Sequence, residues 1–451
     1  MHSFFRFPFL VLLLLAAIPP CSALAQDSME ENPATSLGVL TPFEEYEATA
    51  IAIPAFDRDD NAPVEWQTVP RIIRRDLELS GLFNVTPDKQ AWVNSQNLRD
   101  VRGNKGIDFA AWSGEGFELL LMGRVRIMGD NVVEVTGYLW DVESKSRLFG
   151  KSFRGPADQL RLVTHQLSDE IVRAVKSMDG VARTQILFVN EQIPGIKEAA
   201  LMDADGFNQR LLTNYGKIVT VPAWGANGTE FYYTSYHGNR ANVYGQQFLD
   251  GGTWKIAAYG GTNHAPQWCA ANERLVMVLS KDGNSEIYTC KRDGSDLKRV
   301  TESRATEGSP TWSPDGSKIA FASDEAGGIH LFVVNADGTG KRRLTSKGGW
   351  NDAPSWSPDG KRIAFVSRIG GKNDIYVLDA DGSPDSYRRL TKDVGNNESP
   401  DWAPNSRHLV FSSDRSGKKQ IYIMLDDGSN QRVLTGSGFS NTVPEWGPYP
   451  G

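Results

Sequence analysis

The pattern of apolar and polar positions changes character near Thr184 and divides the chain into two parts. In the first part, two stretches repeat apolar residues every three to four positions, which is typical of amphipathic helices. One is Val64–Leu79, followed by the stop signal Ser80-Gly81. The other is Ala157–Met178, whose apolar residues share one helical face: Leu160, Val163, Leu167, Ile171 and Val175.

The same part contains stretches with the pattern of β-strands. Thr49–Phe56 alternates between apolar and polar residues. Glu118–Ile127 and Val132–Asp141 flank Gly129-Asp130, a pair that predicts a hairpin turn. Together with the two helices, these strands predict a small α/β domain over residues 46–180, an ordinary size for a domain.

The second part carries an internal repeat. The tripeptide Pro-x-Trp occurs six times, and successive tryptophans lie 44, 44, 44, 46 and 44 residues apart. An Asp-Gly pair recurs in phase with it. A period near 44 is typical of four-stranded β-propeller blades, so we predict a propeller over residues 181–451. The tryptophans are Trp224, Trp268, Trp312, Trp356, Trp402 and Trp446.

The phase of the repeat predicts how the ring of blades closes. In a complete unit the four strands are Ser309–Ser313, Lys318–Ala322, Ile329–Asn335 and Lys341–Thr345. Only five residues follow Trp446, so the last unit has only its first strand. Residues 184–213 resemble the other three strands without a Trp strand before them. We expect these two partial units to pair, because closure removes exposed sheet edges.

The predicted fold class is therefore an α+β multidomain protein. A small N-terminal α/β domain is followed by a six-bladed β-propeller that is closed by the C-terminal strand.

Residues 1–25 have the three parts of a secretory signal peptide: Arg6, the apolar run Phe7–Ile18 and the small-x-small site Ala23-Leu24-Ala25. We predict cleavage between Ala25 and Gln26, and a flexible N-terminal segment over residues 26–45. The net charge of −7 argues against binding to nucleic acid, because such proteins are usually basic.

Motifs for catalysis or metal binding are missing from the sequence. There is no Gly-x-Ser-x-Gly elbow and no phosphate-binding Gly-rich loop. The histidines after the signal peptide form no HExxH or His-x-His pair, which argues against a zinc site. We therefore expect a protein that is not an enzyme and has no catalytic residues, no metal and no cofactor. These histidines are His165, His237, His264, His330 and His408.

The repeat also predicts a binding face. Connections between blades crowd around one mouth of the central channel, and the loops between second and third strands share that face. The tryptophans, at one fixed position per blade, are expected to pack between blades rather than to line a carbohydrate groove.

Polar residues precede the Pro at that mouth in five of the six units, with Val219 as the exception, and they have two interpretations. They are either turn residues, for which Asn is well suited, or a polar ring that grips a ligand or peptide. The first polar set lies three residues before Pro: Asn263, Glu307, Asn351, Asn397 and Asn441. The second polar set lies beside it: His264, Asp352, Glu398 and Thr442.

Several segments resemble the TolB family. Trp312-Ser-Pro-Asp-Gly-Ser-Lys-Ile-Ala-Phe is similar to the WD40-like repeats of that family, and so is the corresponding segment from Trp356. Ala52-Ile-Pro-Ala-Phe56, Leu79-Ser-Gly-Leu-Phe83 and the ending after Pro444 add to the resemblance, which covers residues 37–451. The second repeat departs from the pattern, with Cys269-Ala-Ala-Asn in place of Ser-Pro-Asp-Gly.

The resemblance implies a monomeric periplasmic adaptor of the Tol–Pal system, which supports outer-membrane integrity and constriction at division. It implies that the propeller mouth binds the lipoprotein Pal, which gives peripheral association with the outer membrane. It also implies that an N-terminal segment binds TolA. The matching residues here are Leu37, Gly38, Val39, Leu40 and Thr41.

Two other functions stay open on the sequence. A lectin-like propeller would bind carbohydrate without Pal. A relative of the repeat-bearing peptidases would need a C-terminal hydrolase domain with a Ser nucleophile, and here it would have lost that domain.

Overall fold

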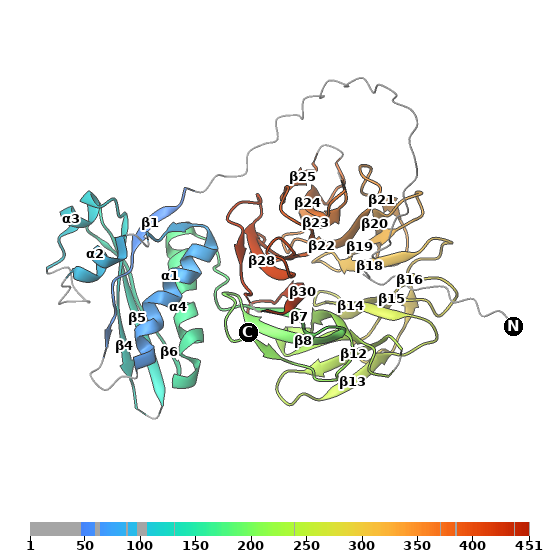
Figure 1. The fold of residues 1–451 in the computed structure, drawn as a ribbon, viewed down its shortest axis with the longest axis horizontal. Coiled ribbons are helices and arrows are strands. Elements are labelled where there is room, and N and C mark those ends of the chain that lie inside the picture. The colour runs from blue at the N-terminus through green and yellow to red at the C-terminus, as the bar shows by residue number, and fades with distance from the viewer. Residues whose placement is uncertain are drawn as a thin grey trace, which may run out of the picture.

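The structure is a computed structural model that describes residues 47–58, 64–86, 89–96, 106–129, 131–238, 240–369, 371–383, 386–436 and 438–450. It consists of an α/β domain beside a β-propeller (Figure 1), so the predicted fold class is confirmed. The predicted signal peptide, its cleavage between Ala25 and Gln26, the segment 26–45 and the residues Leu37–Thr41 lie outside the described residues.

The α/β domain is built on one sheet with the strand order β3-β1-β4-β5-β6, in which β2 also pairs with β4. Strand β1 is parallel to β3 and β4, whereas β4, β5 and β6 are antiparallel. The strands are β1 (Thr49–Ala52), β2 (Asp57–Arg58), β3 (Phe83–Asn84), β4 (Leu119–Ile127), β5 (Val132–Asp141) and β6 (Arg147–Pro156). The helices are η1 (Val64–Thr68), α1 (Val69–Ser80), α2 (Gln90–Ser95), α3 (Phe109–Gly114), η3 (Ala157–Gln159) and α4 (Leu160–Lys176).

Helices α1 and α4 pack side by side and bury their apolar faces in one core with the sheet. Both predicted helices are confirmed, although each begins with a short 3-10 segment. Helix α1 ends where the sequence predicts, because Gly81 adopts the left-handed conformation, with φ of 66°, that closes helices. Strand β6 was not predicted, because Arg147–Pro156 mixes polar and apolar residues without regular alternation.

The propeller has six blades, and each is a four-stranded antiparallel sheet. The first blade comprises β10 (Val219–Trp224), β11 (Glu230–Ser235), β12 (Asn242–Gln247) and β13 (Thr253–Ala257). The second comprises β14 (Asn263–Cys269), β15 (Arg274–Leu279), β16 (Glu286–Cys290) and β17 (Lys298–Arg299). A short 3-10 helix, η4 (Ala226–Gly228), joins β10 to β11. The third comprises β18 (Glu307–Trp312), β19 (Lys318–Ser323), β20 (His330–Asn335) and β21 (Arg342–Arg343). The fourth comprises β22 (Asn351–Trp356), β23 (Arg362–Ser367), β24 (Asp374–Asp379) and β25 (Arg388–Arg389). The fifth is β26 (Asn397–Trp402), β27 (His408–Ser413), β28 (Gln420–Leu425) and β29 (Arg432–Val433).

The last blade closes the ring as the repeat predicts. Its strand order is β30-β7-β8-β9, so the C-terminal strand β30 (Ser440–Trp446) pairs with β7 (Gln185–Ile193), which is followed by β8 (Ile196–Asp203) and β9 (Arg210–Leu211). Asn190 donates a hydrogen bond from Nδ2 to Oδ1 of Asn441 across this junction at 2.7 Å. The two partial repeats thus form one complete blade.

The α/β domain contacts the propeller on the side where the Asp-Gly turns lie, which we call the turn face. The end of α1 meets two neighbouring turns of the fifth blade there. Asn430 Nδ2 donates a hydrogen bond to the carbonyl of Glu78 at 3.2 Å, and His408 Nε2 donates to the carbonyl of Ser80 at 3.0 Å. In Figure 1 the domain accordingly stands next to the red strands β28 and β30.

Candidate functional site

The face opposite the turn face is the mouth face, where the connections between blades gather. In the first blade Val219 pairs with Ser235, and Val243 pairs with Ala257. The loops that begin after Ser235 and after Ala257 therefore leave their strands at the end where the innermost strand begins. The same register holds in the other blades, and their innermost strands contact one another around the ring. This agrees with the face expected from the repeat.

The first polar set is buried beneath the mouth face. Asn263, Asn351, Asn397 and Asn441 are 0 % exposed and Glu307 is 1 % exposed. Side chains this deeply buried do not reach a partner that rests on the surface. Of the two interpretations that the sequence leaves open, burial favours a structural role for this set.

Hydrogen bonds show what that structural role is. Asn441 Nδ2 donates to Gln420 Oε1 at 3.0 Å, and Asn397 Nδ2 donates to Asp374 Oδ1 at 3.3 Å. Gln420 and Asp374 each begin the third strand of the preceding blade. The asparagines therefore bind neighbouring blades together through buried polar contacts, which buried amides require in order to be satisfied.

The second polar set is half-buried on the innermost strands. Burial lowers the pKa of His264 to about 4, so this imidazole is neutral at pH 7. Burial also raises the pKa of Asp352. Glu398 forms an ion pair with Lys419 and accepts a hydrogen bond from Asn373 Nδ2 at 3.0 Å. Contact of this set with a partner stays a prediction.

Every innermost strand has a β-bulge just before its Pro-x-Trp. The pairing register shifts there in all six blades, and the residue before each Pro has a positive φ. The sequence did not predict this, because a residue that precedes proline is normally extended. Bulges re-aim side chains and are common next to functional sites. The six residues are Val221, Ala265, Ser309, Ala353, Ser399 and Val443, with φ between 46° and 53°.

Two acidic residues that the sequence analysis did not single out lie deep in the ring, at the middle position of Pro-x-Trp. Burial raises the pKa of Asp401 to about 6, and this carboxylate accepts hydrogen bonds from Ser355 Oγ at 2.6 Å and from the amide of Trp446 at 2.7 Å. Burial and the charge of Asp401 raise the pKa of Glu445 well above its usual range. The sequence contains a signal for these two residues, because the middle position of Pro-x-Trp is acidic only in the last two units.

Exposed apolar side chains also lie on the mouth face, and the sequence analysis missed them. Ile193 is 58 % exposed and Phe439 is 41 % exposed, and Tyr259 and Ile369 are exposed to a similar degree. They belong to different blades: Ile193 ends strand β7, and the other three lie in the loops after β29, β13 and β23. Each is a large, exposed side chain, and aromatic and apolar side chains of this kind anchor protein partners.

The repeated tryptophans lie in the core of the propeller, as predicted. Trp312, Trp402 and Trp446 are buried and the other three are half-buried. They pack in apolar clusters that join neighbouring blades. Trp402 Nε1, for example, donates a hydrogen bond to the carbonyl of Ser355 in the preceding blade at 3.2 Å.

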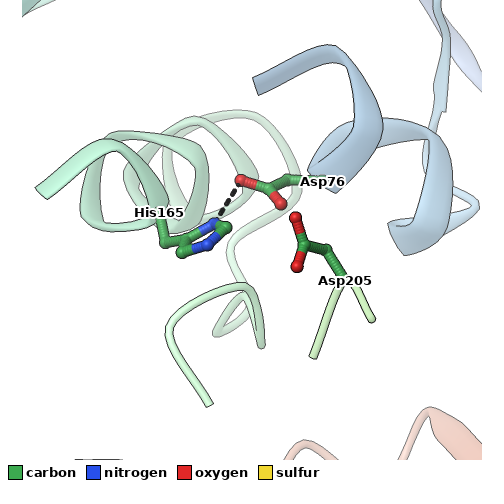
Figure 2. A group of neighbouring side chains, drawn as sticks. All are labelled: Asp76, His165 and Asp205. Carbon is green, nitrogen blue, oxygen red and sulfur yellow. Dashed lines mark hydrogen bonds and ion pairs between the residues drawn. The ribbon is translucent and has the colours of Figure 1, made fainter. Parts of the chain in front are cut away.

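A third group of polar residues lies between the domains: Asp76 in α1, His165 in α4 and Asp205 in the turn after β8 (Figure 2). His165 Nδ1 is 2.8 Å from Asp76 Oδ2. Burial lowers the pKa of His165, but the charges of Asp76 and Asp205 outweigh burial and raise it to about 9. The sequence analysis missed this group, although Asp76 lies on the apolar face of its helix, four residues after Ile72.

In the described part of the chain, no helix combines the length and the apolar character that a membrane span requires.

Comparison with known proteins matches both parts of the chain. Residues 44–148 match the model of the TolB amino-terminal domain, and residues 172–352 and 339–450 match that of the TolB beta propeller domain. The chain is 30 % identical over 245 residues to the Tol-Pal system protein TolB of Rickettsia felis, and 31 % identical over 245 residues to that of Rickettsia africae. Each alignment covers 52 % of this chain and 53 % of the relative, so the chain spans about half the length of the curated relatives it matches.

Among solved structures, the crystal structure of TolB from Acinetobacter baumannii superposes with a TM-score of 0.77 and 25 % identity, covering 89 % of this chain and 96 % of that one. The fold, an α/β domain followed by a six-bladed propeller, is thus shared with a TolB protein over 89 % of this chain. The chain belongs to the TolB family.

Proposed function

We propose that this chain is a periplasmic, non-enzymatic adaptor of the Tol–Pal system that binds the lipoprotein Pal at its mouth face. The observation that carries the proposal is the set of exposed apolar side chains on that face, which come from different blades. Large side chains on loops of a rigid scaffold are suited to a protein partner. The relatives named above are Tol-Pal system proteins, which supports the choice of partner.

The position of the α/β domain supports the same proposal. Its contacts with the propeller lie on the turn face, through residues such as Asn430 and His408. A partner can therefore approach the mouth face without displacing the described part of the domain. The half-buried Glu398 and Thr442 then lie at the rim of the channel, where they add polar contacts.

Binding of Pal to purified variants tests this assignment. Ile369→Asp and Phe439→Asp each place a charge among the mouth side chains, and we expect each to weaken binding at least about tenfold, as loss of an apolar anchor does. The matched control is Leu249→Asp. Leu249 is 96 % exposed in the turn between β12 and β13, on the turn face. If Pal does not bind the wild-type chain, or binds all three variants equally, the assignment is wrong.

We further propose that the N-terminal segment, with Leu37–Thr41 at its centre, binds TolA after removal of residues 1–25. Deletion of residues 26–45 should abolish TolA binding and leave Pal binding intact, because the two sites are separate. Loss of both activities, or of neither, would contradict separate sites. Retention of peptidoglycan fragments by the propeller without Pal would instead favour the lectin-like alternative.

A further inference from the structure

Three side chains from separate elements meet at the interface between the α/β domain and the propeller (Figure 2). Asp76, His165 and Asp205 each offer one nitrogen or oxygen atom, and these three atoms lie within 4.8 Å of one another. All three residues are buried, with exposed fractions of 6 %, 2 % and 2 %. Two come from the domain and one from the propeller, so whatever joins them also joins the two parts of the chain.

Two atoms of this group have no hydrogen-bond partner although they are buried. Asp76 uses Oδ2, which accepts a hydrogen bond from Ser168 Oγ at 2.6 Å and contacts His165 Nδ1. Its other oxygen, Oδ1, is unpartnered, and so is Nε2 of His165. In Figure 2 the free side of the Asp76 carboxylate faces Asp205. Buried polar atoms are nearly always satisfied, so the unpartnered Asp76 Oδ1, which faces Asp205 (Figure 2), indicates a missing ligand between these two carboxylates.

A small cavity of about 20 Å³ adjoins Asp76 and Asp205 but is not lined by His165, and the rest of its lining is mostly apolar apart from Ser80, Ser168 and Asp169. This volume holds one water molecule or one ion. Arg161 already pairs with Asp205, and an ion bound between the two carboxylates would place a further positive charge beside Asp76.

We propose that Asp76, His165 and Asp205 bind one divalent transition-metal ion, for which Zn²⁺ is the best chemical match. Zn²⁺ is commonly held by imidazole nitrogen and carboxylate oxygen. His165 Nδ1 already lies 2.8 Å from Asp76 Oδ2, so both atoms can contact one ion once the proton between them is lost, as happens when a metal binds. Tetrahedral bonds of about 2.1 Å place ligand atoms about 3.4 Å apart, so the side chains need to close by about 1 Å.

The surrounding charges are compatible with such an ion. Asp205 forms an ion pair with Arg161, which also lies 3.6 Å from Asp203. Arg161 therefore keeps a carboxylate partner when Asp205 turns toward the metal. The ion itself is neutralised by Asp76 and Asp205, and it would tie α1 and α4 to the turn after β8.

Metal titration of the purified chain tests this proposal, with Zn²⁺ in a calorimeter and with Co²⁺ as a spectroscopic probe. Because the site is buried, the metal is added both to the folded protein and during refolding. We expect one equivalent to bind, Co²⁺ to give ligand-field absorption bands, and the unfolding temperature to rise with metal concentration. Crystals grown with Co²⁺ should show an anomalous peak between the three side chains.

The variants Asp76→Asn and His165→Gln should each weaken binding at least about tenfold, the usual scale for a lost contact in a metal site. His237→Gln, at an exposed histidine on the mouth face, should bind as the wild type does. The proposal is overturned if the wild type binds no stoichiometric metal under either condition, if His165→Gln binds it equally well, or if the crystal shows only a water molecule at this point.

Discussion

The indole Nε1 of Trp446 donates a hydrogen bond to Oγ1 of Thr184 at 2.8 Å, although these residues lie 262 positions apart in the chain. Trp446 belongs to the closing strand β30, and Thr184 immediately precedes β7. The contact therefore lies at the point where the ring is joined.

Removal of the Trp446 side chain tests how much this closure stabilises the propeller. Trp446→Ala should lower the free energy of unfolding by about 3–5 kcal/mol, because it leaves a cavity in the apolar cluster of the last blade. Thr184→Val keeps the shape but removes this hydrogen bond together with the one that Thr184 Oγ1 donates to the carbonyl of Val181, so it should lower the free energy of unfolding by about 1–3 kcal/mol. Urea denaturation measures both. An equal effect of the two substitutions would show that packing of the indole contributes little.

Protonation of His165 predicts a specific dependence of stability on pH. Its pKa is raised to about 9 in the folded chain, so its stabilising contribution is complete below pH 6.5 and is lost as the pH rises through about 9. A rise from 6.5 to about 9 corresponds to roughly 3 kcal/mol. Without added metal, the difference in free energy of unfolding between wild type and His165→Gln should shrink by about that amount between pH 6.5 and pH 10. Urea denaturation across this range would contradict the prediction if the difference stayed constant.

Substitution of Asn441 separates a structural role from a binding role in the first polar set. Asn441→Ala removes the buried hydrogen bonds that link Asn441 to Gln420 and to Asn190, so the free energy of unfolding should fall by about 2 kcal/mol. The folded variant should still bind Pal as the wild type does. Thr442→Ala, one residue away in the second polar set, should have the smaller effect on stability. Loss of Pal binding by a stable Asn441→Ala protein would show that this residue contributes to the binding site.

The bulge before each Pro predicts that substitution by glycine destabilises the protein less at the bulged residue than in a regular strand. Ala353 has a φ of 49°, a conformation that costs an alanine about 1–3 kcal/mol and glycine almost nothing. Ala364 lies in the regular strand β23 of the same blade and is fully buried. Ala353→Gly should therefore be less destabilising than Ala364→Gly, by about 1–2 kcal/mol in thermal or urea denaturation. The opposite order would mean that the bulge is not strained.

The sequence determined the architecture because its signals are local and periodic. Pro-x-Trp and Asp-Gly recur at nearly constant intervals, and one tight turn and one large core residue per unit are enough to specify a blade. The closure by Trp446 followed from counting strands, since one strand at the C-terminus and three after Thr184 complete a single sheet. The helices α1 and α4 followed from the spacing of their apolar residues.

Only the tertiary structure decided which polar residues face solvent and which are buried. Asn397 looks like a loop residue in the sequence, but its partner Asp374 lies in another blade, so its burial depends on how two sheets pack. The same holds for Asp76, His165 and Asp205, which are separated along the chain by 89 positions and by 40 positions in turn. They meet because the α/β domain docks on the turn face. Such long-range packing has no periodic signal in the sequence.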